Sequence, residues 1–268
     1  MAKLRIKIGK TEFMADGNQE HIEKELSAFA EMIRNAPAVV NITNFLPEIG
    51  LKKVDKGRKI AQADKGVKVV MHKSEQIAWE NLAGSLQLHD EFECDLSDGN
   101  RVTFVLINES DGYLIFCSKD CMTRHRMNDS ASNKGGIAAS EMQKYLDTEI
   151  WNLLPDGLKN IIAETRRKYK DGDQIKEFDT KLFLLSASEV FDKDDCYGEE
   201  GLYNQIDYFK DEKNRVKCKD KETAYWWLSS PIAGYSTNFC SVNTSGGADN
   251  NNAGNARGVV PCFCIKKS

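Results

Sequence analysis

The order of apolar patterns along the chain predicts an α+β fold. Alternating strand patterns come first, two helical patterns follow near the middle, and further strands with long loops occupy the C-terminal third. Strands and helices segregated in this way are typical of α+β domains, because consecutive parallel strands would each need a helix between them. The chain has 268 residues, 41% of them hydrophobic, so it is long enough for one large domain and a smaller module.

Residues 1–36 are predicted to form the smaller module, a β-hairpin followed by a helix. Two alternating runs, "LRIKIG" and "TEFMAD", flank a tight turn at Gly9 and Lys10. Apolar residues spaced by three and four over residues 19–35 indicate the helix. A hairpin and one helix bury little surface alone. We therefore expect this module to attach the chain to a phage tail or another assembly, or to form a homo-oligomer.

Residues 37–79 are predicted to be a linker or arm, because they lack a regular period. The stretch "LKKVDKGRKIAQADKGVKVVMHK" is locally basic. A solvated arm is favoured over a phosphate-binding patch, since no aromatic residues are interleaved with the lysines.

The large domain is expected over residues 80–268 and begins with a three-stranded meander. Asp98-Gly99 and Asp111-Gly112 separate three alternating runs. Asp-Gly between such runs is a strong hairpin signal, so antiparallel strands joined by short turns are predicted.

Two helices and further strands are expected after the meander. Ser140 and Gln143 form a capping-box pattern that predicts the start of one helix, and Pro155 separates it from the next. Strand character returns in "TKLFLLSASEVF" and in "AYWWLSSP", which Pro231 terminates. The run "GVVPCFCI" is predicted to be a closing strand.

Charge and the N-terminal residues indicate location and partners. The formal net charge is −4, so no global basic field attracts nucleic acid. No apolar run is long enough to cross a bilayer, and "MAKLRIKIGKTEF" lacks the apolar region of a signal peptide. We therefore expect cytoplasmic synthesis without a signal peptide, no membrane span and no nucleic-acid partner.

The chain has eight cysteines, and buried free thiols are favoured over disulfides because no export signal is present. No CxxC pair occurs. Cys262 and Cys264 have no histidine nearby in the sequence, and His125, four residues after Cys121, has no further Cys or His close to it on its C-terminal side. A structural zinc site therefore has weak support.

The motifs of common enzyme classes are missing from the sequence. No GxxxxGK[ST], GxGxxG, HExxH or GxSxG occurs. The acidic run "DKDDCYGEE" lacks the glycine at the sixth position and the closing glutamate of an EF-hand loop. Nothing near Cys264 in the sequence would activate its thiol. We therefore predict a protein that is not an enzyme, with no catalytic residue, cofactor or metal site. The histidines lie in unrelated contexts, at His21, His72, His89 and His125.

The C-terminal segment, residues 223–265, is rich in asparagine and yet is predicted to be ordered. Six of the 18 residues from Asn238 to Asn255 are Asn, and no charged residue occurs from Thr223 to Ala248. Disordered tails are rich in charge and poor in aromatic residues. The aromatic residues of this segment are costly to leave in water: Tyr225, Trp226, Trp227, Tyr235, Phe239 and Phe263.

Small apolar and polar residues alternate in this segment. Cys240 and Val242 are predicted to point inward from a strand. One interpretation is an Asn/Gly-rich hairpin loop that binds nothing. The other is an ordered scaffold that displays exchangeable side chains, since Asn, Ser, Tyr and Gly are favoured in antibody-like binding surfaces. The residues predicted to point outward are Phe239, Ser241, Asn243 and Ser245.

The motifs "YWWLSSP" and "GVVPCFCI", with the small polar stretch between them, resemble the end of a family of phage and prophage proteins with a C-type-lectin-like fold. Many of its members resemble variable proteins of diversity-generating retroelements. The family pattern is roughly W-W-L-R-S-P, then alternating Asn, Ser and Tyr, then G-V-x-P-x-F. With "KYLDTEIWNLLP" and "KLFLLSASEVF", the resemblance covers residues 80–268. Ser229 and Val260 stand where arginine is usual, so any salt bridge made by those arginines is absent.

The resemblance implies a ligand-binding, receptor- or adhesin-like protein with a variable region at residues 226–265. In such systems a reverse transcriptase miscopies adenines, so Asn codons become Ser, Thr, Tyr, Asp, Gly or Ala codons. A protein or glycan on a cell surface is the implied ligand, with assembly into a virion as one setting. The last strand is implied to pair with the early meander. The lectin signatures EPN, QPD and WND do not occur, so the fold does not imply sugar binding.

Two alternative functions are kept beside the ligand-binding one. One alternative is a catalyst related to formylglycine-generating enzymes, with Cys262 and Cys264 as a reactive pair. The other is a structural subunit of a phage particle that binds no ligand.

The resemblance also assigns residues to two parts of the variable region, the contact surface and the scaffold. The implied contact residues are Tyr235, Ser236, Asn238, Ser241, Asn243, Ser245, Gly247, Asn250, Asn252, Gly254, Asn255, Ala256 and Arg257. The implied scaffold residues are Trp226, Trp227, Pro231, Cys240, Val242, Pro261 and Phe263.

Overall fold

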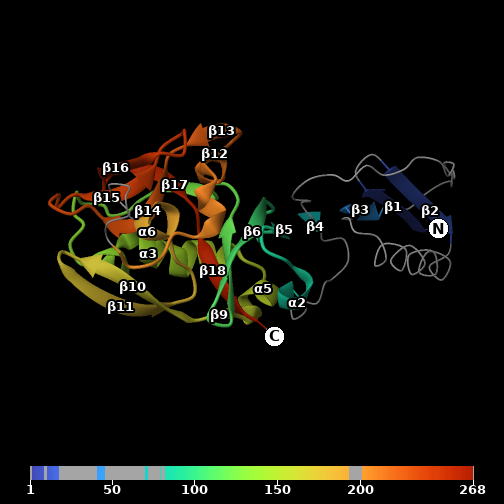
Figure 1. The fold of residues 1–268 in the computed structure, drawn as a ribbon, viewed down its shortest axis with the longest axis horizontal. Coiled ribbons are helices and arrows are strands. Elements are labelled where there is room, and N and C mark those ends of the chain that lie inside the picture. Colours follow the sequence, from blue (N-terminus) through green and yellow to red (C-terminus); the bar gives the residue numbers. More distant parts are fainter. Residues whose placement is uncertain are drawn as a thin grey trace. The chain divides into compact units, whose positions relative to one another are not determined.

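A computed structural model gives the fold of the chain (Figure 1). The chain divides into two compact units, Met1–Gln76 with Asp90–Glu93 and Ile77–His89 with Cys94–Ser268. The residues that the structure describes are 2–8, 11–17, 41–45, 70–71, 79, 82–192 and 201–267.

The N-terminal unit contains a three-stranded sheet in the order β2-β1-β3. β1 (Ala2–Ile8) and β2 (Thr11–Gly17) pair antiparallel, which confirms the predicted hairpin. β3 (Asn41–Phe45) pairs with the other edge of β1, so a strand occupies part of the expected arm. The backbone groups on that edge of β1 need partners, and β3 provides them. The helix predicted over 19–35 and most of 37–79 lie outside the described residues.

The first of the two larger sheets, with six strands in the order β4-β5-β6-β7-β18-β9, contains the predicted meander. β5 (Glu91–Asp95), β6 (Arg101–Ser110) and β7 (Tyr113–Ser118) are consecutive neighbours, which confirms the prediction from the Asp-Gly signals. The turn between β6 and β7 is formed by Asp111 (φ 52°) and Gly112 (φ 78°). Two left-handed residues are what a two-residue hairpin turn requires.

The same sheet joins the end of the chain to the meander. β18 (Cys262–Lys266) pairs antiparallel with β7, with Cys262 opposite Cys117. The expectation that the last strand pairs with the meander is therefore confirmed. β9 (Ile162–Ala163) pairs with the other edge of β18, and β4 (Val70–Met71) pairs in parallel with the start of β5.

The second sheet has five strands in the order β16-β15-β14-β17-β8. β14 confirms the strand predicted for "AYWWLSSP". The single closing strand expected for "GVVPCFCI" is corrected, because Val260 and Pro261 divide it between β17 and β18 of different sheets. Proline has no N–H for a sheet ladder, so the chain changes sheets there. In sheet order, the strands are Ala248–Asn252, Asn238–Val242, Trp226–Pro231, Ala256–Val259 and Thr123–Arg126.

A helical run begins after β8 in the sequence, directly behind η2 (Ile137–Ala139). α3 (Glu141–Tyr145) continues through a π-helical turn, η3 (Leu146–Ile150), into α4 (Trp151–Leu153). The Ser140 hydroxyl accepts a hydrogen bond from the backbone N–H of Gln143 at 3.1 Å, which confirms the predicted helix start. Residues spaced by four form the buried side of the run: Met142, Leu146 and Ile150.

Several short elements complete the C-terminal unit. α5 (Asp156–Ile161) begins directly after Pro155, as predicted. Short helical turns and a two-stranded ribbon surround the sheets. They are α2 (Leu82–Ser85), η2 (Ile137–Ala139), η5 (Asp207–Lys210), η6 (Glu212–Arg215), β12 (Lys217–Lys219) and β13 (Glu222–Ala224).

A separate hairpin of β10 (Thr165–Asp171) and β11 (Gln174–Thr180) was missing from the predicted elements. Its turn contains Gly172, with φ 59°, directly after Asp171. The Asp-Gly signal that located the meander was therefore present here as well.

The strand expected for "TKLFLLSASEVF" is corrected to one bridge and a short helix. Thr180 ends β11, and after it only Phe183 forms a β-bridge, to Cys262. α6 (Ala187–Val190) follows, with a capping box between Ser186 and Glu189. The capping box favours the start of a helix over a continued strand. The apolar residues of this stretch are buried, and buried apolar residues form the same pattern in a core strand and in a short core helix.

The main core of the C-terminal unit joins both sheets. Trp226 and Val242 of the second sheet share one buried cluster with Cys117 and Cys262 of the first sheet and with Phe183. Helices and antiparallel strands in this arrangement confirm the α+β class. Among the described residues, no helix is long and apolar enough to cross a membrane.

Candidate functional site

The C-terminal segment consists of buried strands and exposed loops. All of Phe239, Cys240, Ser241 and Val242 in β15 are buried, and Ser241 is 0% exposed. The prediction that Phe239 and Ser241 point outward is therefore wrong. Cys240 and Val242 face the main core, while Ser241 lies opposite Trp227 on the other, equally covered face of the sheet. Ser241 is thus excluded as a ligand contact.

Exposed side chains gather on two neighbouring loops, the β14–β15 loop (232–237) and the β16–β17 loop (253–255). The N–H of Ala253 donates to the carbonyl of Thr237 at 2.8 Å, so the two loops lie side by side. Ala233 and Gly234 are also exposed. We call four of the exposed residues on or next to these loops the loop surface: Tyr235, Ser236, Asn255 and Ala256.

The loop surface is anchored to a distant part of the chain. The Asn133 side chain donates to the carbonyls of Tyr235 at 2.6 Å and Asn238 at 2.9 Å, and its backbone N–H donates to Ser236 at 2.8 Å. The N–H of Met127 donates to Ala253 at 2.9 Å. These bonds hold both loops in one conformation before any ligand arrives.

Tyr235 is the most exposed large hydrophobic side chain among the described residues. Its exposed fraction is 64%, compared with 59% for Ile175 and 51% for Leu88. The Asn133 bond fixes its backbone, while the ring extends into solvent. An exposed aromatic ring on a fixed backbone is a typical anchor of a binding surface.

The β15–β16 turn (243–247) is largely half-buried, with only Ser245 exposed, and its asparagine has a structural role. The Asn243 side-chain oxygen accepts hydrogen bonds from the N–H of Ser245 at 2.9 Å and of Gly247 at 3.0 Å, and from the Ser245 hydroxyl at 2.8 Å. At Gly246, φ is 89° and an added Cβ would lie 2.7 Å from the carbonyl oxygen of Glu212. The sequence of this turn is therefore dictated by its conformation.

The remaining asparagines of the segment bond to each other. Asn238 donates to Asn250 at 2.7 Å, and Asn255 donates to the side chain of Asn251 at 2.9 Å. Asn252 accepts from the N–H of Gly254 at 2.9 Å and so shapes the β16–β17 loop. Asn238, Asn250, Asn252 and Gly254 are half-buried, so they contribute both to the fold and to the surface.

Arg257 was predicted as a contact residue and lies half-buried. Its guanidinium lies 4.2 Å from the ring centroid of Tyr225. Its Nε is buried and finds no hydrogen-bond acceptor among the described residues. The stacking contact therefore positions this side chain.

The residues predicted to form the scaffold are buried, apart from the half-buried Pro231. The indole N–H of Trp227 donates to the carbonyl of His125 at 2.9 Å, and that of Trp226 donates to Arg215 at 2.8 Å. Ser229, at the position where arginine was expected, is itself buried, and its backbone N–H donates to Leu185 at 2.8 Å.

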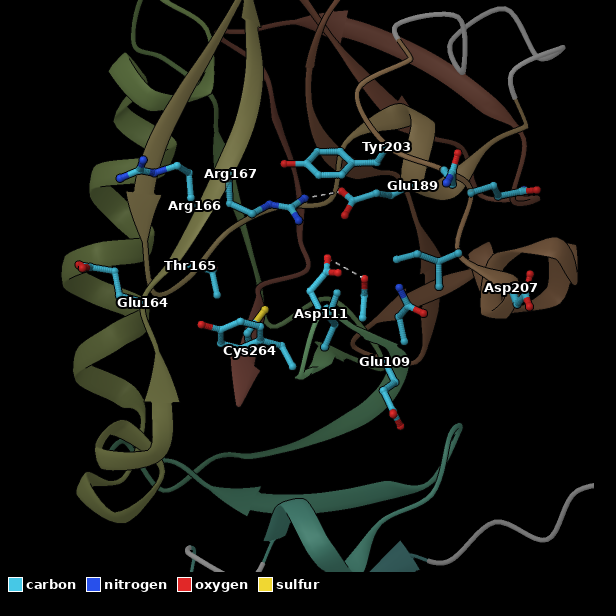
Figure 2. A pocket seen from close by; sticks show the side chains of 17 residues that line it. Glu109, Asp111, Glu164, Thr165, Arg166, Arg167, Glu189, Tyr203, Asp207 and Cys264 are labelled. Atoms are coloured by element: carbon cyan, nitrogen blue, oxygen red, sulfur yellow. Dashed lines mark hydrogen bonds and ion pairs between the residues drawn. The ribbon is translucent and has the colours of Figure 1, made fainter. Parts of the chain in front are cut away.

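A cavity of about 740 Å³ lies away from the loop surface (Figure 2). Arg167 lies between the rings of Phe183 and Tyr203, at 4.2 and 4.3 Å, and its NH2 lies 2.5 Å from the Glu189 carboxylate. The sequence did not indicate this cavity. Its lining comes from separate segments around residues 108–115, 164–167, 203–207 and 264, and no local motif marks them.

The cysteines predicted as an alternative reactive pair differ in their surroundings. Cys264 lines the cavity, whereas Cys262 is 0% exposed and does not. Burial raises the pKa of Cys264 to about 11, so its thiol stays protonated at neutral pH. His125 lies on β8 and stacks on Tyr145 with ring centroids 4.0 Å apart. No group of three or more His, Cys, Asp or Glu in the described part of the chain is placed to hold a metal ion.

The comparison with protein families matches residues 111–267, more than half of the chain, to a family described as a domain of unknown function (DUF6273). The match includes β7, both strands of the β10–β11 hairpin and the whole C-terminal segment. No curated protein and no solved structure matched the chain.

Proposed function

The chain belongs to the family of the domain of unknown function DUF6273, and we propose that it is a non-enzymatic protein that binds a ligand through its loop surface. In this proposal the scaffold is C-type-lectin-like and the surface is diversified by a retroelement. The ligand is a protein or glycan on a cell surface. The N-terminal unit joins the chain to a larger assembly, such as a phage tail.

The exposure of Tyr235 on an anchored loop is the observation that carries this proposal. Leaving a large aromatic ring in water opposes the hydrophobic effect, so a monomer gains nothing from it. The backbone of the ring is fixed by Asn133, which lowers the entropy lost on binding. Ser236 and Asn255 beside it supply adaptable hydrogen-bonding groups.

The division between buried strands and exposed loops also supports diversification. The strands that would have to remain constant contain Trp226, Trp227 and Phe239, all buried. The exposed residues are types to which an Asn codon converts when its adenines are miscopied, such as Tyr235, Ser236 and Ala256. The connection of β18 to the meander fixes the C-terminal end of the segment, as the resemblance to the lectin-like family implied.

Display of two libraries of the full chain tests the binding surface. One library randomises the loop surface, and the other randomises exposed positions of the β10–β11 hairpin, at Lys168, Gln174, Ile175 and Glu177. Both are selected against hen egg lysozyme as a defined probe protein. We expect folded binders from the loop-surface library alone. Equal yields from both libraries, or unfolded clones from the loop-surface library, would contradict the proposal.

The retroelement part has a genomic test. We expect a reverse-transcriptase gene beside this gene and a near-copy of the bases that encode the C-terminal segment. Differences between the two copies should coincide with adenines of the template. Differences scattered over all four bases would reject diversification and leave the binding proposal to the library experiment.

Two other functions receive less support from the geometry. A formylglycine-generating type of catalyst needs a reactive cysteine pair, whereas burial raises the pKa of both Cys262 and Cys264. A purely structural phage subunit would not need an exposed Tyr235. If alanine replacements across the loop surface left every binding phenotype of the wild-type chain intact, the structural subunit would be favoured.

A further inference from the structure

Two buried cysteines lie directly opposite each other where the last strand meets the meander. Cys117 of β7 and Cys262 of β18 are partners in the antiparallel register, and each is 0% exposed. The thiol of Cys262 donates to the carbonyl of Val260 at 3.6 Å, and each of the two thiols influences the pKa of the other. The residues that surround them belong to the main core of the C-terminal unit.

The backbone shows which kind of antiparallel pair this is. The N–H and the carbonyl of Cys262 both bond to Phe183, at 2.8 and 3.0 Å, on the side away from Cys117. Cys117 and Cys262 are therefore a non-hydrogen-bonded pair, in which the Cα atoms lie about 4.5 Å apart and the side chains approach closely. A disulfide spans Cα separations of about 4.4–6.8 Å, so this register suits one without a shift of the strands.

A buried cation lies beside the pair. Lys217 is 1% exposed, and its ammonium donates to the carbonyls of Ser118 at 3.3 Å and Lys119 at 2.9 Å. Its charge favours the thiolate forms of both Cys117 and Cys262. The neighbouring thiol of Cys262 lowers the pKa of Cys117, while burial raises the pKa of Cys262.

We propose that Cys117 and Cys262 form a redox-sensitive cross-strand disulfide that locks β18 onto β7 when a small-molecule disulfide is the oxidant. The thiolate of one of the two cysteines, for example Cys117, attacks one sulfur of the oxidant, a mixed disulfide forms, and one thiolate leaves. Cys262 then attacks the Cys117 sulfur, and the second thiolate leaves. Two electrons pass to the oxidant, and the two cysteine protons end on the released thiols.

The position of the disulfide gives it a consequence for the C-terminal segment. β18 follows β17 after only Val260 and Pro261, so locking β18 fixes the end of the segment that carries the loop surface. The cross-link closes a loop of roughly 145 residues, which restricts the unfolded chain strongly. Exchange needs β18 to separate from β7 transiently, because neither sulfur is exposed. We therefore expect slow formation that accelerates in dilute urea.

Incubation of the full chain with oxidised glutathione, followed by non-reducing peptide mapping, tests the proposal. We expect one peptide pair joined through Cys117 and Cys262, and a midpoint of thermal unfolding higher by roughly 5–10 °C than that of the reduced chain. The Cys262→Ala variant should lose this difference. The Cys264→Ala variant should keep it, because Cys264 lies opposite Ile115 on the same strand.

A second cysteine pair provides the competing outcome. Cys121 donates its backbone N–H to Cys218 at 3.0 Å, and Cys218 is partly exposed. A link between Cys121 and Cys218 in place of the Cys117–Cys262 link would overturn the proposal. A wild-type chain in which both Cys117 and Cys262 still react with iodoacetamide after oxidation in urea would overturn it as well.

Discussion

The β15–β16 turn and the β16–β17 loop are both built from Asn and Gly, but their asparagines have different roles. Asn243 in the turn accepts three hydrogen bonds and holds the turn together. Asn255 in the loop is exposed, and its side chain donates one hydrogen bond, to the side chain of Asn251. Composition alone therefore does not separate a structural asparagine from an exchangeable one, because both roles use the same amide group.

The largest effect on the free energy of unfolding is expected from replacing glycines. Gly246 of the β15–β16 turn is compared with Gly234 of the β14–β15 loop. Gly246 and Gly234 both have left-handed φ values, of 89° and 77°. An added Cβ at Gly246 meets the Glu212 carbonyl oxygen, whereas nothing lies within 4 Å at Gly234. Gly246→Ala should cost about 2–3 kcal/mol of unfolding free energy, and Gly234→Ala about 1 kcal/mol. Urea unfolding of both variants measures the difference, and equal costs would show that the turn has no special constraint.

A smaller effect on the free energy of unfolding is expected from replacing Asn243 of the turn and Asn255 of the β16–β17 loop by alanine. Asn243→Ala removes an acceptor shared by three donors and should lower the unfolding free energy by about 1–2 kcal/mol. Asn255→Ala should change it by about 0.5 kcal/mol or less, because the side chain is exposed. Chemical denaturation followed by tryptophan fluorescence is suitable, since Trp226 and Trp227 are buried. A larger loss at Asn255 than at Asn243 would reverse the assignment of roles.

The smallest effect on stability is expected at Tyr235. Tyr235→Ser removes an exposed ring and retains the backbone carbonyl that Asn133 bonds, so the unfolding free energy should change by about 0.5 kcal/mol or less. Asn133→Ala is the matched change beneath the same loop and should be clearly more destabilising, because two carbonyls lose a donor. If Tyr235→Ser were as destabilising as Asn133→Ala in thermal unfolding, the ring would be part of the fold and not a free contact.

The predicted elements that succeeded rest on signals only a few residues long. Asp111-Gly112 specifies its turn through two left-handed residues, and Ser140 caps its helix through the N–H of Gln143. The same kind of signal at Asp171-Gly172 was present but unused. The prediction for "TKLFLLSASEVF" failed because buried apolar residues look alike in a strand and in a short core helix.

The sequence by itself determined the α+β class, the meander, the start of the long helix and the order of the C-terminal segment, because turns, caps and apolar periods are local. Only the tertiary structure decided which residues of that segment reach solvent. Ser241 is buried because a second layer covers its face of the sheet, and Tyr235 is held in place by Asn133, 102 residues away. The cavity that contains the Arg167–Glu189 ion pair likewise arises from segments far apart in the chain, and so does the pairing of Cys117 opposite Cys262. Burial is a property of packing between distant segments, which a local pattern does not contain.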